Sequence, residues 1–329
     1  MMDFEQLFSD FSSSKVVIVG DVMLDTYWWG HVDRISPEAP VPVVALNRKE
    51  LRVGGAANVA LNTASLGAAT TLISVIGKDE DGKSLTALLR SSGINTDYFV
   101  VAEDRITTNK TRVMSRNQQM MRLDAEDTGD VNDAIAAKLL EMTERLFKTD
   151  RPDVLILEDY NKGVLTPAVI EGIISLCKTY GVVTAVDPKK KNFLAFKDVD
   201  IFKPNLKEVK EGLNLSPAAI DESSLKQIHA ALKQELNHRV SLITLSEKGV
   251  YFQDGQQSRI IPTHIRNIAD VSGAGDTVIA VASLTYAVTK DMELAAEMAN
   301  IAGGLVCEEV GTAAIDREKL LQECKMLLQ

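Results

Sequence analysis

The sequence predicts an α/β fold in which a mainly parallel β-sheet lies between two layers of helices. Short runs of β-branched residues recur along the chain, and stretches with a helical apolar pattern separate them. Because these runs are apolar on both faces, they are typical of strands that helices cover on each side. The expected strands are 16–19, 71–76, 154–157, 182–186 and 240–245.

The stretch 135–146 illustrates the helical pattern. Ile135, Leu139, Met142 and Leu146 follow one another at spacings of four, three and four residues, so they share one helix face. Two further helices are expected over 278–288 and 292–307.

Two segments interrupt the alternation of strands and helices. Residues 27–52 contain three prolines, and residues 97–124 are rich in Thr and Arg with short alternating patterns. We expect both segments to form a small lid of β-strands over one edge of the sheet. Because no Gly-, Ser- or Pro-rich linker and no internal repeat divides the chain, all 329 residues (1–329) are predicted to form one domain.

The composition indicates an ordinary globular protein. Apolar residues make up 45% of the chain and charged residues 25%, which excludes disorder and a coiled coil. The net charge of -10 argues against binding to nucleic acid. Three cysteines without C-x-x-C spacing, no secretory signal and no apolar run of membrane-spanning length predict a cytoplasmic protein that contacts no membrane.

The segment 270–277, Asp-Val-Ser-Gly-Ala-Gly-Asp-Thr, carries the strongest chemical signal. Gly273, Ala274 and Gly275 allow a tight turn whose N–H groups point outward at the start of the helix that follows. Such a turn binds anions, and Asp276 lies where a carboxylate could take a proton from a hydroxyl that attacks phosphorus. Alternatively, Asp276 is an N-cap and the glycines form a plain turn.

Two earlier segments support a site for a polar ligand. In Val53-Gly-Gly-Ala-Ala-Asn58, which opens a helix running to Leu66, two glycines and an amide let a polar ligand approach the backbone. In Gly20-Asp-Val-Met-Leu-Asp25, which follows the first strand, two carboxylates could accept hydrogen bonds from sugar hydroxyls. Taken alone, the first segment is also explained by helix packing and the second by a solvated loop.

Together, these segments resemble the PfkB family of ribokinase-like sugar kinases. One family motif is similar to the stretch from Gly54 to Gly67, and the other to 270–277. Three further segments resemble the heptose 7-phosphate kinases, which form the kinase part of bifunctional heptose-activating enzymes. These segments are 34–43, 115–119 with 122–124, and Asp-Tyr-x-Lys-Gly at 159–163. The resemblance covers essentially the whole chain and implies a ribokinase-like three-layer α/β/α fold with a β lid.

The resemblance also implies roles for single residues. Asp276 is expected to act as the general base on the anomeric hydroxyl, and the amides of the 273–275 turn to stabilise the transferring phosphoryl group. Asn205 and Glu208 match the family's N-x-x-E motif, which helps to place ATP and Mg²⁺, with Glu208 acting on the metal through water. Read alone, these two residues fit a turn and a solvated helix face.

Nucleotide contacts follow from the same resemblance. The expected ATP-binding residues are Asn205, Glu208, Ser246, Lys248, Gly249, Gly273, Gly275, Asn300 and Gly304. At Leu245 the chain departs from the small or polar residue that related kinases have there.

For the acceptor, the resemblance implies a second set of residues. Asp21 and Asp25 are expected to bind sugar hydroxyls. A sugar that already carries a phosphate also needs cations, which Lys110, Arg112 and Lys162 supply. The full set of expected acceptor-binding residues is Asp21, Asp25, Gly54, Gly55, Asn58, Lys110, Arg112, Asp159 and Lys162.

Three other patterns carry less weight. Residues 77–84 match the Walker A pattern, but Asp79, Glu80 and Asp81 would place three negative charges against a phosphate, so we interpret the segment as a loop. The four histidines have no metal-ligand spacing. The three lysines at 189–191 are predicted to form a solvated loop.

The sequence therefore predicts a kinase that transfers the γ-phosphoryl group of ATP to the anomeric hydroxyl of D-glycero-D-manno-heptose 7-phosphate, giving heptose 1,7-bisphosphate for nucleotide-heptose and lipopolysaccharide core synthesis. The alternatives are a kinase of another sugar or sugar phosphate and a catalytically silent sugar-binding protein on the same fold. Because the chain stops at Gln329, no nucleotidyltransferase domain is expected. We expect a homodimer formed through the lid, because exposed lid strands can pair with another copy and because related kinases often dimerise in this way.

Overall fold

The computed structural model describes residues 2–116, 118–215 and 220–328. Its strands are β1 (Lys15–Gly20), β2 (Val22–Ile35), β3 (Pro42–Gly55), β4 (Ala69–Gly77), β5 (Asn95–Ala102), β6 (Asn109–Ser115), β7 (Gln118–Ala125), β8 (Val154–Glu158), β9 (Val183–Asp187), β10 (Ile201–Phe202), β11 (Val240–Thr244), β12 (Val250–Gln253) and β13 (Ser258–Ile261).

Helices alternate with these strands along most of the chain. They are α1 (Phe4–Phe11), α2 (Ala56–Ser65), α3 (Glu80–Ser91), α4 (Asp133–Thr149), α5 (Pro167–Tyr180), α6 (Leu206–Gly212), α7 (Glu222–Leu236), α8 (Ala274–Thr289), α9 (Met292–Val306) and α10 (Arg317–Leu327), with short 3₁₀ helices η1 (Lys190–Asn192) and η2 (Ser246–Lys248). None of the described helices is both long and apolar enough to cross a membrane.

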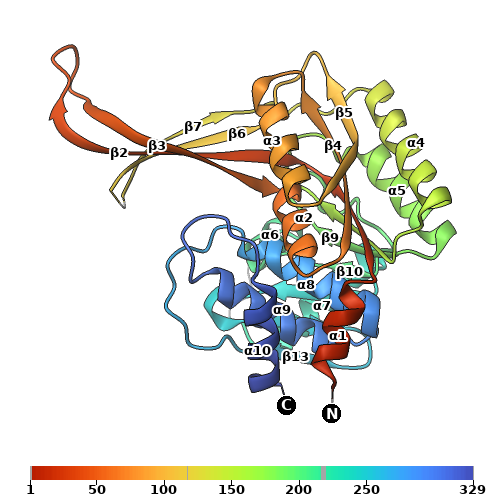
Figure 1. Cartoon of the computed structure of the whole chain (residues 1–329). Coiled ribbons are helices and arrows are strands. Elements are labelled where there is room, and N and C mark those ends of the chain that lie inside the picture. Colours follow the sequence, from red (N-terminus) through yellow and green to blue (C-terminus); the bar gives the residue numbers. More distant parts are fainter. Residues whose placement is uncertain (1, 117, 216–219, 329) are drawn as a thin grey trace.

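The strands form two sheets of different size (Figure 1). The larger sheet has nine strands in the order β13-β12-β11-β10-β9-β8-β1-β4-β5, and all pairs from β11 to β5 are parallel. Strand β12 runs antiparallel to both of its neighbours. The five strands expected from the sequence are β1, β4, β8, β9 and β11, whose ends lie within two residues of the expected ones.

Side chains of the central strands point alternately into two cores. Val16 and Ile18 of β1 pack with α1, α2, α8, α9 and α10. Val17 and Val19 of the same strand pack with α4, α5 and α7 on the opposite face. Burial on both faces explains why most positions of these strands are apolar, and it confirms the predicted three-layer architecture.

The smaller sheet, which we call the lid, has the order β3-β2-β6-β7 and projects away from the body of the molecule (Figure 1). Its first hairpin extends beyond the expected segment 27–52, from Val22 to Gly55. The expectation that 97–124 belongs wholly to the lid is wrong. Residues 97–102 lie in β5, the edge strand of the large sheet, because Val100 and Ala102 bury their side chains in its core.

The strand order brings several loops to one edge of the large sheet. Strands β1, β8, β9, β10 and β11 are parallel, so the loops after their carboxyl ends meet at the same edge. Helix α8 begins at Ala274, ahead of the expected start at 278, and packs against β8 and β9. The amino-terminal turn of α8 therefore lies close to the ends of these two strands.

Candidate active site

Asp276 lies in the first turn of α8 and is only 3% exposed. Its Oδ1 accepts a hydrogen bond from the hydroxyl of Tyr160 at 2.7 Å, and its Oδ2 accepts one from Asn58 Nδ2 at 2.8 Å. Burial raises the pKa of Asp276 to about 6, although both hydrogen bonds act to lower it. This carboxylate can therefore accept a proton near neutral pH.

The turn before Asp276 contains three N–H groups that were expected to bind an anion, those of residues 273–275. Gly273 caps α8 with a φ of +79°, and a Cβ there would lie 2.7 Å from Asn58 Nδ2, so a side chain cannot fit. The N–H of Ala274 donates to the carbonyl of Val271 at 3.3 Å, so this amide is already engaged. Among the described residues, the N–H groups of Gly273 and Gly275 have no acceptor, which leaves two of the three expected donors for an anion.

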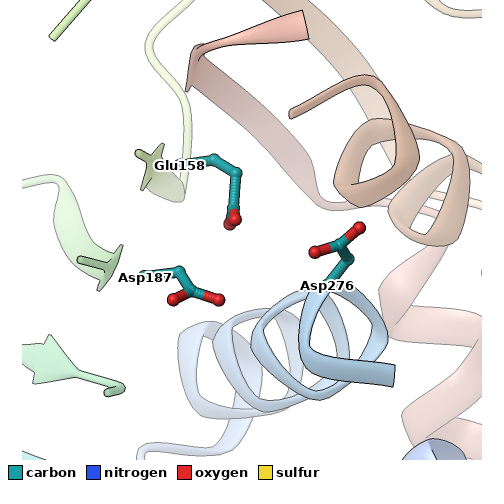
Figure 2. Close-up of side chains that lie close together, drawn as sticks. All are labelled: Glu158, Asp187 and Asp276. Carbon is teal, nitrogen blue, oxygen red and sulfur yellow. The ribbon is translucent and has the colours of Figure 1, made fainter. Parts of the chain in front are cut away.

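Three buried carboxyl groups point toward a common space (Figure 2). Glu158 ends β8, Asp187 ends β9, and one oxygen of each lies within 4.8 Å of the others and of an oxygen of Asp276. Glu158 is fully buried, and neither of its oxygens has a hydrogen-bond partner within the described chain. Burial raises the pKa of Glu158 well above its usual value, and the charges of the other two carboxylates add to this effect.

Two lysines partly balance these charges. Lys203 Nζ lies 2.7 Å from Asp187 Oδ2, and Lys189 Nζ lies 3.1 Å from Asp187 Oδ1 and 2.8 Å from Glu208 Oε1. Burial acts to raise the pKa of Asp187, but the two lysines outweigh it and hold the value below its usual range. The expectation that Lys189 belongs to a solvated loop is wrong, because its ion pairs turn the side chain into the site.

The carboxyl cluster therefore has the composition of a metal site. Glu158, Asp187 and Asp276 offer carboxylate oxygens, which hard cations such as Mg²⁺ prefer. Three carboxyl groups face two ammonium groups, and the oxygens of Glu158 have no hydrogen-bond partner among the residues that the structure describes. A divalent cation would supply the missing positive charge.

A cavity of about 790 Å³ opens beside the turn, and the segment 262–272 forms its outer wall. Ile265 and Ile268 give this wall an apolar surface, while Lys189 and Lys203 lie at the polar end. The cavity thus suits a ligand with an apolar ring and an anionic tail. The expected ATP-binding residues that line it are Asn205, Ser246, Gly249, Gly273, Gly275, Asn300 and Gly304.

Two expected nucleotide residues do not line this cavity. Lys248 is an exposed residue of η2 and is not among the residues that line the cavity. Glu208 forms a capping box with Asn205: its Oε2 accepts the Asn205 N–H at 2.7 Å, and Asn205 Oδ1 accepts the Glu208 N–H at 2.8 Å. Asn300 does line the cavity, but its Nδ2 donates to the carbonyl of Pro262 at 2.8 Å, so this amide anchors the outer wall.

Asp21 and Asp159, which the resemblance assigns to the acceptor, both accept hydrogen bonds from backbone N–H groups. Asp21 is 1% exposed and accepts three backbone N–H groups, from Tyr160 at 2.8 Å and from Lys162 and Val164 at 3.0 Å each. Asp159 accepts the N–H of Asn161 at 2.7 Å, and burial raises its pKa to about 6. Both carboxylates therefore fix the loop after β8, because they bond to its own backbone.

Asp25 and the neighbouring glycines form a tightly packed corner at the root of the lid. Asp25 Oδ1 lies 2.5 Å from Arg112 Nη1. A Cβ on Gly54 would lie 2.6 Å from Asp25 Oδ2, and Gly55 has a φ of +60°. The two glycines are therefore required by the backbone conformation and by close packing. Asp25 and Arg112, both expected to bind the acceptor, form an ion pair here.

Lys110 and Lys162 also come together, through a residue that the sequence did not single out. Lys110 Nζ lies 3.1 Å from Glu126 Oε2, and Lys162 Nζ lies 2.8 Å from the same oxygen. Lys110 is also paired with Asp124 at 3.2 Å. Burial acts to raise the pKa of Glu126, but the two lysines lower it, so the carboxylate stays ionised between them.

Sequence reasoning missed Glu158, Tyr160 and Asp187. Two of them had a usable signal, since Glu158 and Asp187 each directly follow an expected strand, where parallel sheets place functional groups. Tyr160 lies inside the quoted 159–163 motif. Only its contact with Asp276, 116 residues further along the chain, distinguishes it from a packing aromatic residue.

The segment that matches Walker A is filled by the chain itself. Asp79 caps α3, with Oδ1 accepting the Gly82 N–H at 2.7 Å and Oδ2 accepting the Thr107 N–H at 2.8 Å. A Cβ on Gly77 would meet the carbonyl oxygen of Arg105 at 2.5 Å. The interpretation of 77–84 as a loop is wrong for most of its length, because Gly77 ends β4 and residues 80–84 lie in the first turns of α3.

Known proteins resemble this chain along most of its length. The Bifunctional protein HldE of Sulfurimonas denitrificans is 37% identical over 301 residues, which cover 92% of this chain and 62% of that protein. The chain spans about three fifths of the length of the curated relatives it matches.

Solved structures share the fold at lower identity. Escherichia coli phosphofructokinase-2 in complex with potassium gives a TM-score of 0.80 at 18% identity, covering 96% of this chain and 100% of that one. Arabidopsis thaliana ribokinase complexed with ribose and ATP gives 0.72 at 18% identity, covering 94% and 99%. These likenesses confirm the ribokinase-like fold. Residues 13–319 match the pfkB family carbohydrate kinase, so the chain belongs to this family of ATP-using phosphotransferases with an alcohol group as acceptor.

Proposed function

We propose that the chain phosphorylates the anomeric hydroxyl of D-glycero-D-manno-heptose 7-phosphate, giving heptose 1,7-bisphosphate for nucleotide-heptose and surface polysaccharide synthesis. The 37% identity to a Bifunctional protein HldE supports this substrate class. The observation that carries the proposal is the loop after β8, which Asp21 anchors. Tyr160 of this loop contacts the candidate base Asp276, and Lys162, two residues on, lies beside Lys110 at a shared carboxylate.

Asp276 is the proposed general base. Its carboxylate takes the proton of the attacking hydroxyl, while Asn58 and Tyr160 keep it oriented through one hydrogen bond to each oxygen. The amides of Gly273 and Gly275 and the ammonium groups near Asp187 stabilise the negative charge of the transferring phosphoryl group.

Glu158 and Asp187 are the residues that would hold Mg²⁺, beside Asp276, whose two oxygens already accept from Tyr160 and Asn58. The oxygens of Glu158, which have no hydrogen-bond partner in the described part of the chain, support this assignment. When bound, the metal neutralises charge on the nucleotide phosphates. Glu208, expected from the sequence to act through water, is proposed to act through Lys189, with which it forms an ion pair at 2.8 Å.

The phosphate of the acceptor is proposed to bind at Lys110 and Lys162. Glu126 lies between their ammonium groups and accepts from both, which is the geometry that a phosphate oxygen would adopt. Arg112 is held by Asp25 and adds a third cation at the root of the lid. A bound phosphate dianion would compete with Glu126 for the two lysines.

Homodimerisation through the lid belongs to the same proposal. Strand β7 is exposed along its whole length. Large apolar side chains are exposed on the lid strands, namely Ile35, Leu46, Leu51, Met120, Met121 and Leu123. A second copy would cover them. Sedimentation velocity should give a dimer for the native chain and a monomer for Met121→Lys with Leu123→Lys, whereas a native monomer would contradict the proposal.

The decisive experiment is ADP release from ATP and Mg²⁺ with a panel of acceptors. The panel holds D-glycero-D-manno-heptose 7-phosphate, the dephosphorylated heptose, ribose and fructose 6-phosphate. Asp276→Asn tests dependence on the base, and Asp133→Asn, an exposed carboxylate on α4, is the matched control.

Three outcomes separate the alternatives. Turnover that is selective for the heptose phosphate and lost in Asp276→Asn alone supports the proposal. Turnover of another sugar would support the proposed kinase reaction but would contradict the heptose phosphate as its acceptor. Absence of turnover with every acceptor favours a silent sugar-binding protein.

A further inference from the structure

Arg52 connects the lid to a loop beside the anion-binding turn. It lies on β3, and its Nη1 donates to the carbonyl of Val310 and, at 3.2 Å, to that of Thr312. The other side of the guanidinium donates to Glu50, with Nε 2.7 Å from Oε1. A planar fork of this kind fixes its partners in direction as well as in distance.

The residue between these two carbonyls depends on this arrangement. Gly311 has a φ of +75°, and a Cβ there would lie 2.6 Å from Arg52 Nη1 and 2.7 Å from the hydroxyl of Tyr27. Its N–H donates to Asp270 Oδ2 at 2.9 Å. The guanidinium thus holds the carbonyls of the residues on either side of Gly311, and so keeps the Gly311 N–H directed at Asp270.

Asp270 carries the connection to the turn. Its Oδ1 accepts the N–H of Ser272 at 3.0 Å and the hydroxyl of Ser272 at 2.8 Å. Ser272 directly precedes Gly273, the residue that caps α8. An unbroken series of contacts therefore runs from the lid to the amides that face a transferring phosphoryl group.

The same arginine also faces the acceptor side of the lid. Arg52 and Arg112 both lie against the ring of Tyr27, with guanidinium carbons 5.1 and 5.3 Å from its centroid. Arg112 in turn is paired with Asp25. Arg52 is thus packed between the acceptor side and the loop at 310–312.

We propose that Arg52 is a positioning residue for phosphoryl transfer: it holds the loop at 310–312 and, through Asp270, sets the amides of the turn at 273–275. It contacts none of the reacting groups itself. The inference rests on the proposed function, because its assay uses the acceptor assigned there.

The test replaces Arg52 by Lys, which keeps the charge and removes the fork, and by Ala. Because the turn acts on charge that develops during transfer, kcat should fall about tenfold or more while KM for the sugar phosphate stays within about threefold. Arg48→Ala is the matched control, since Arg48 lies on the same strand and binds the same Glu50 but is not bonded to the 310–312 loop. Thermal melting verifies that each variant is folded.

A double-mutant cycle with Asp270→Asn distinguishes positioning from general support of the lid. If Arg52 acts through Asp270, the double variant Arg52→Ala with Asp270→Asn should be no slower than the slower single variant. Fully additive losses, or native kcat in Arg52→Lys and Arg52→Ala, would overturn the inference. Failure of the native chain to turn over the heptose phosphate would instead reject the proposed function, and the cycle would then be measured with whichever sugar is turned over.

Discussion

Tyr160 donates a hydrogen bond to Oδ1 of Asp276 at 2.7 Å, so the loop after β8 fixes the carboxylate at the start of α8. Asn58 holds the other oxygen at 2.8 Å. Both donors favour the charged carboxylate, whereas burial disfavours it, and the balance puts the pKa of Asp276 at about 6. The phenol of Tyr160 therefore controls both the orientation and the proton affinity of the proposed base.

Tyr160→Phe should shift the pH dependence of the kinase. The change removes one hydrogen bond to the charged form, so the pKa of Asp276 should rise above about 6. Because the base must be ionised to act, the acid limb of kcat/KM should move to higher pH, with a loss of about tenfold near the acid limb and little change well above it. A pH profile measures this shift, with Tyr98→Phe on β5 as the control. An unmoved acid limb in a folded variant would contradict the role of Tyr160.

Glu158→Gln should make the metal-free protein more stable and weaken its binding of Mg²⁺. Burial raises the pKa of Glu158, so the folded state holds its proton more tightly than the unfolded chain, and the group lowers stability as pH rises above the usual value of 4.5. The variant should therefore melt at a higher temperature than the native chain near neutral pH without Mg²⁺. It should also need about tenfold more Mg²⁺ for half-maximal turnover. Glu144→Gln, in an exposed pair on α4, is the control for both measurements, and an unchanged Mg²⁺ requirement would reject Glu158 as a ligand.

Lys110→Ala and Lys162→Ala should each weaken binding of the phosphorylated acceptor. Both ammonium groups contact Glu126 and neither lines the nucleotide cavity, so KM for the sugar phosphate should rise about tenfold while KM for ATP stays within about twofold. Initial rates with each substrate varied in turn measure the two constants. Lys78→Ala, in an exposed pair with Glu103, is the control. Equal effects on both substrates would place the lysines outside the acceptor site.

Lys83→Ala should leave turnover within about twofold of the native rate. The side chain is 71% exposed and paired with Glu80, and the segment before it is filled by its own backbone contacts. A Walker A lysine would instead contact the phosphates of the nucleotide. Steady-state rates check this expectation, and a loss of roughly a hundredfold would restore the Walker A interpretation.

Local patterns in the sequence were enough to predict most of the large sheet. Strands β1 and β8 are recognisable because both of their faces are buried, so 16–19 and 154–157 are continuous apolar runs. Strand β5 was misassigned because it lies at the edge of the sheet and mixes exposed with buried residues, so it lacks the continuous apolar run of the central strands. The pattern of apolar residues indicates how many faces of a strand are buried, but it does not indicate which sheet the strand belongs to.

By itself, the sequence indicated the family and pointed to a candidate anion-binding turn and a candidate base, because glycines and a carboxylate at fixed spacing act through a few adjacent residues. Only the tertiary structure decided which polar groups are partners. Tyr160 and Asp276 are 116 residues apart in the chain, and Arg52 and Val310 are 258 apart. It also showed that Asp21 and Asp159, the expected sugar ligands, accept hydrogen bonds from the backbone of the loop after β8. Burial, charge compensation and hydrogen bonding depend on which groups the fold places within a few ångströms of one another. The number of residues between two groups in the sequence does not predict that distance.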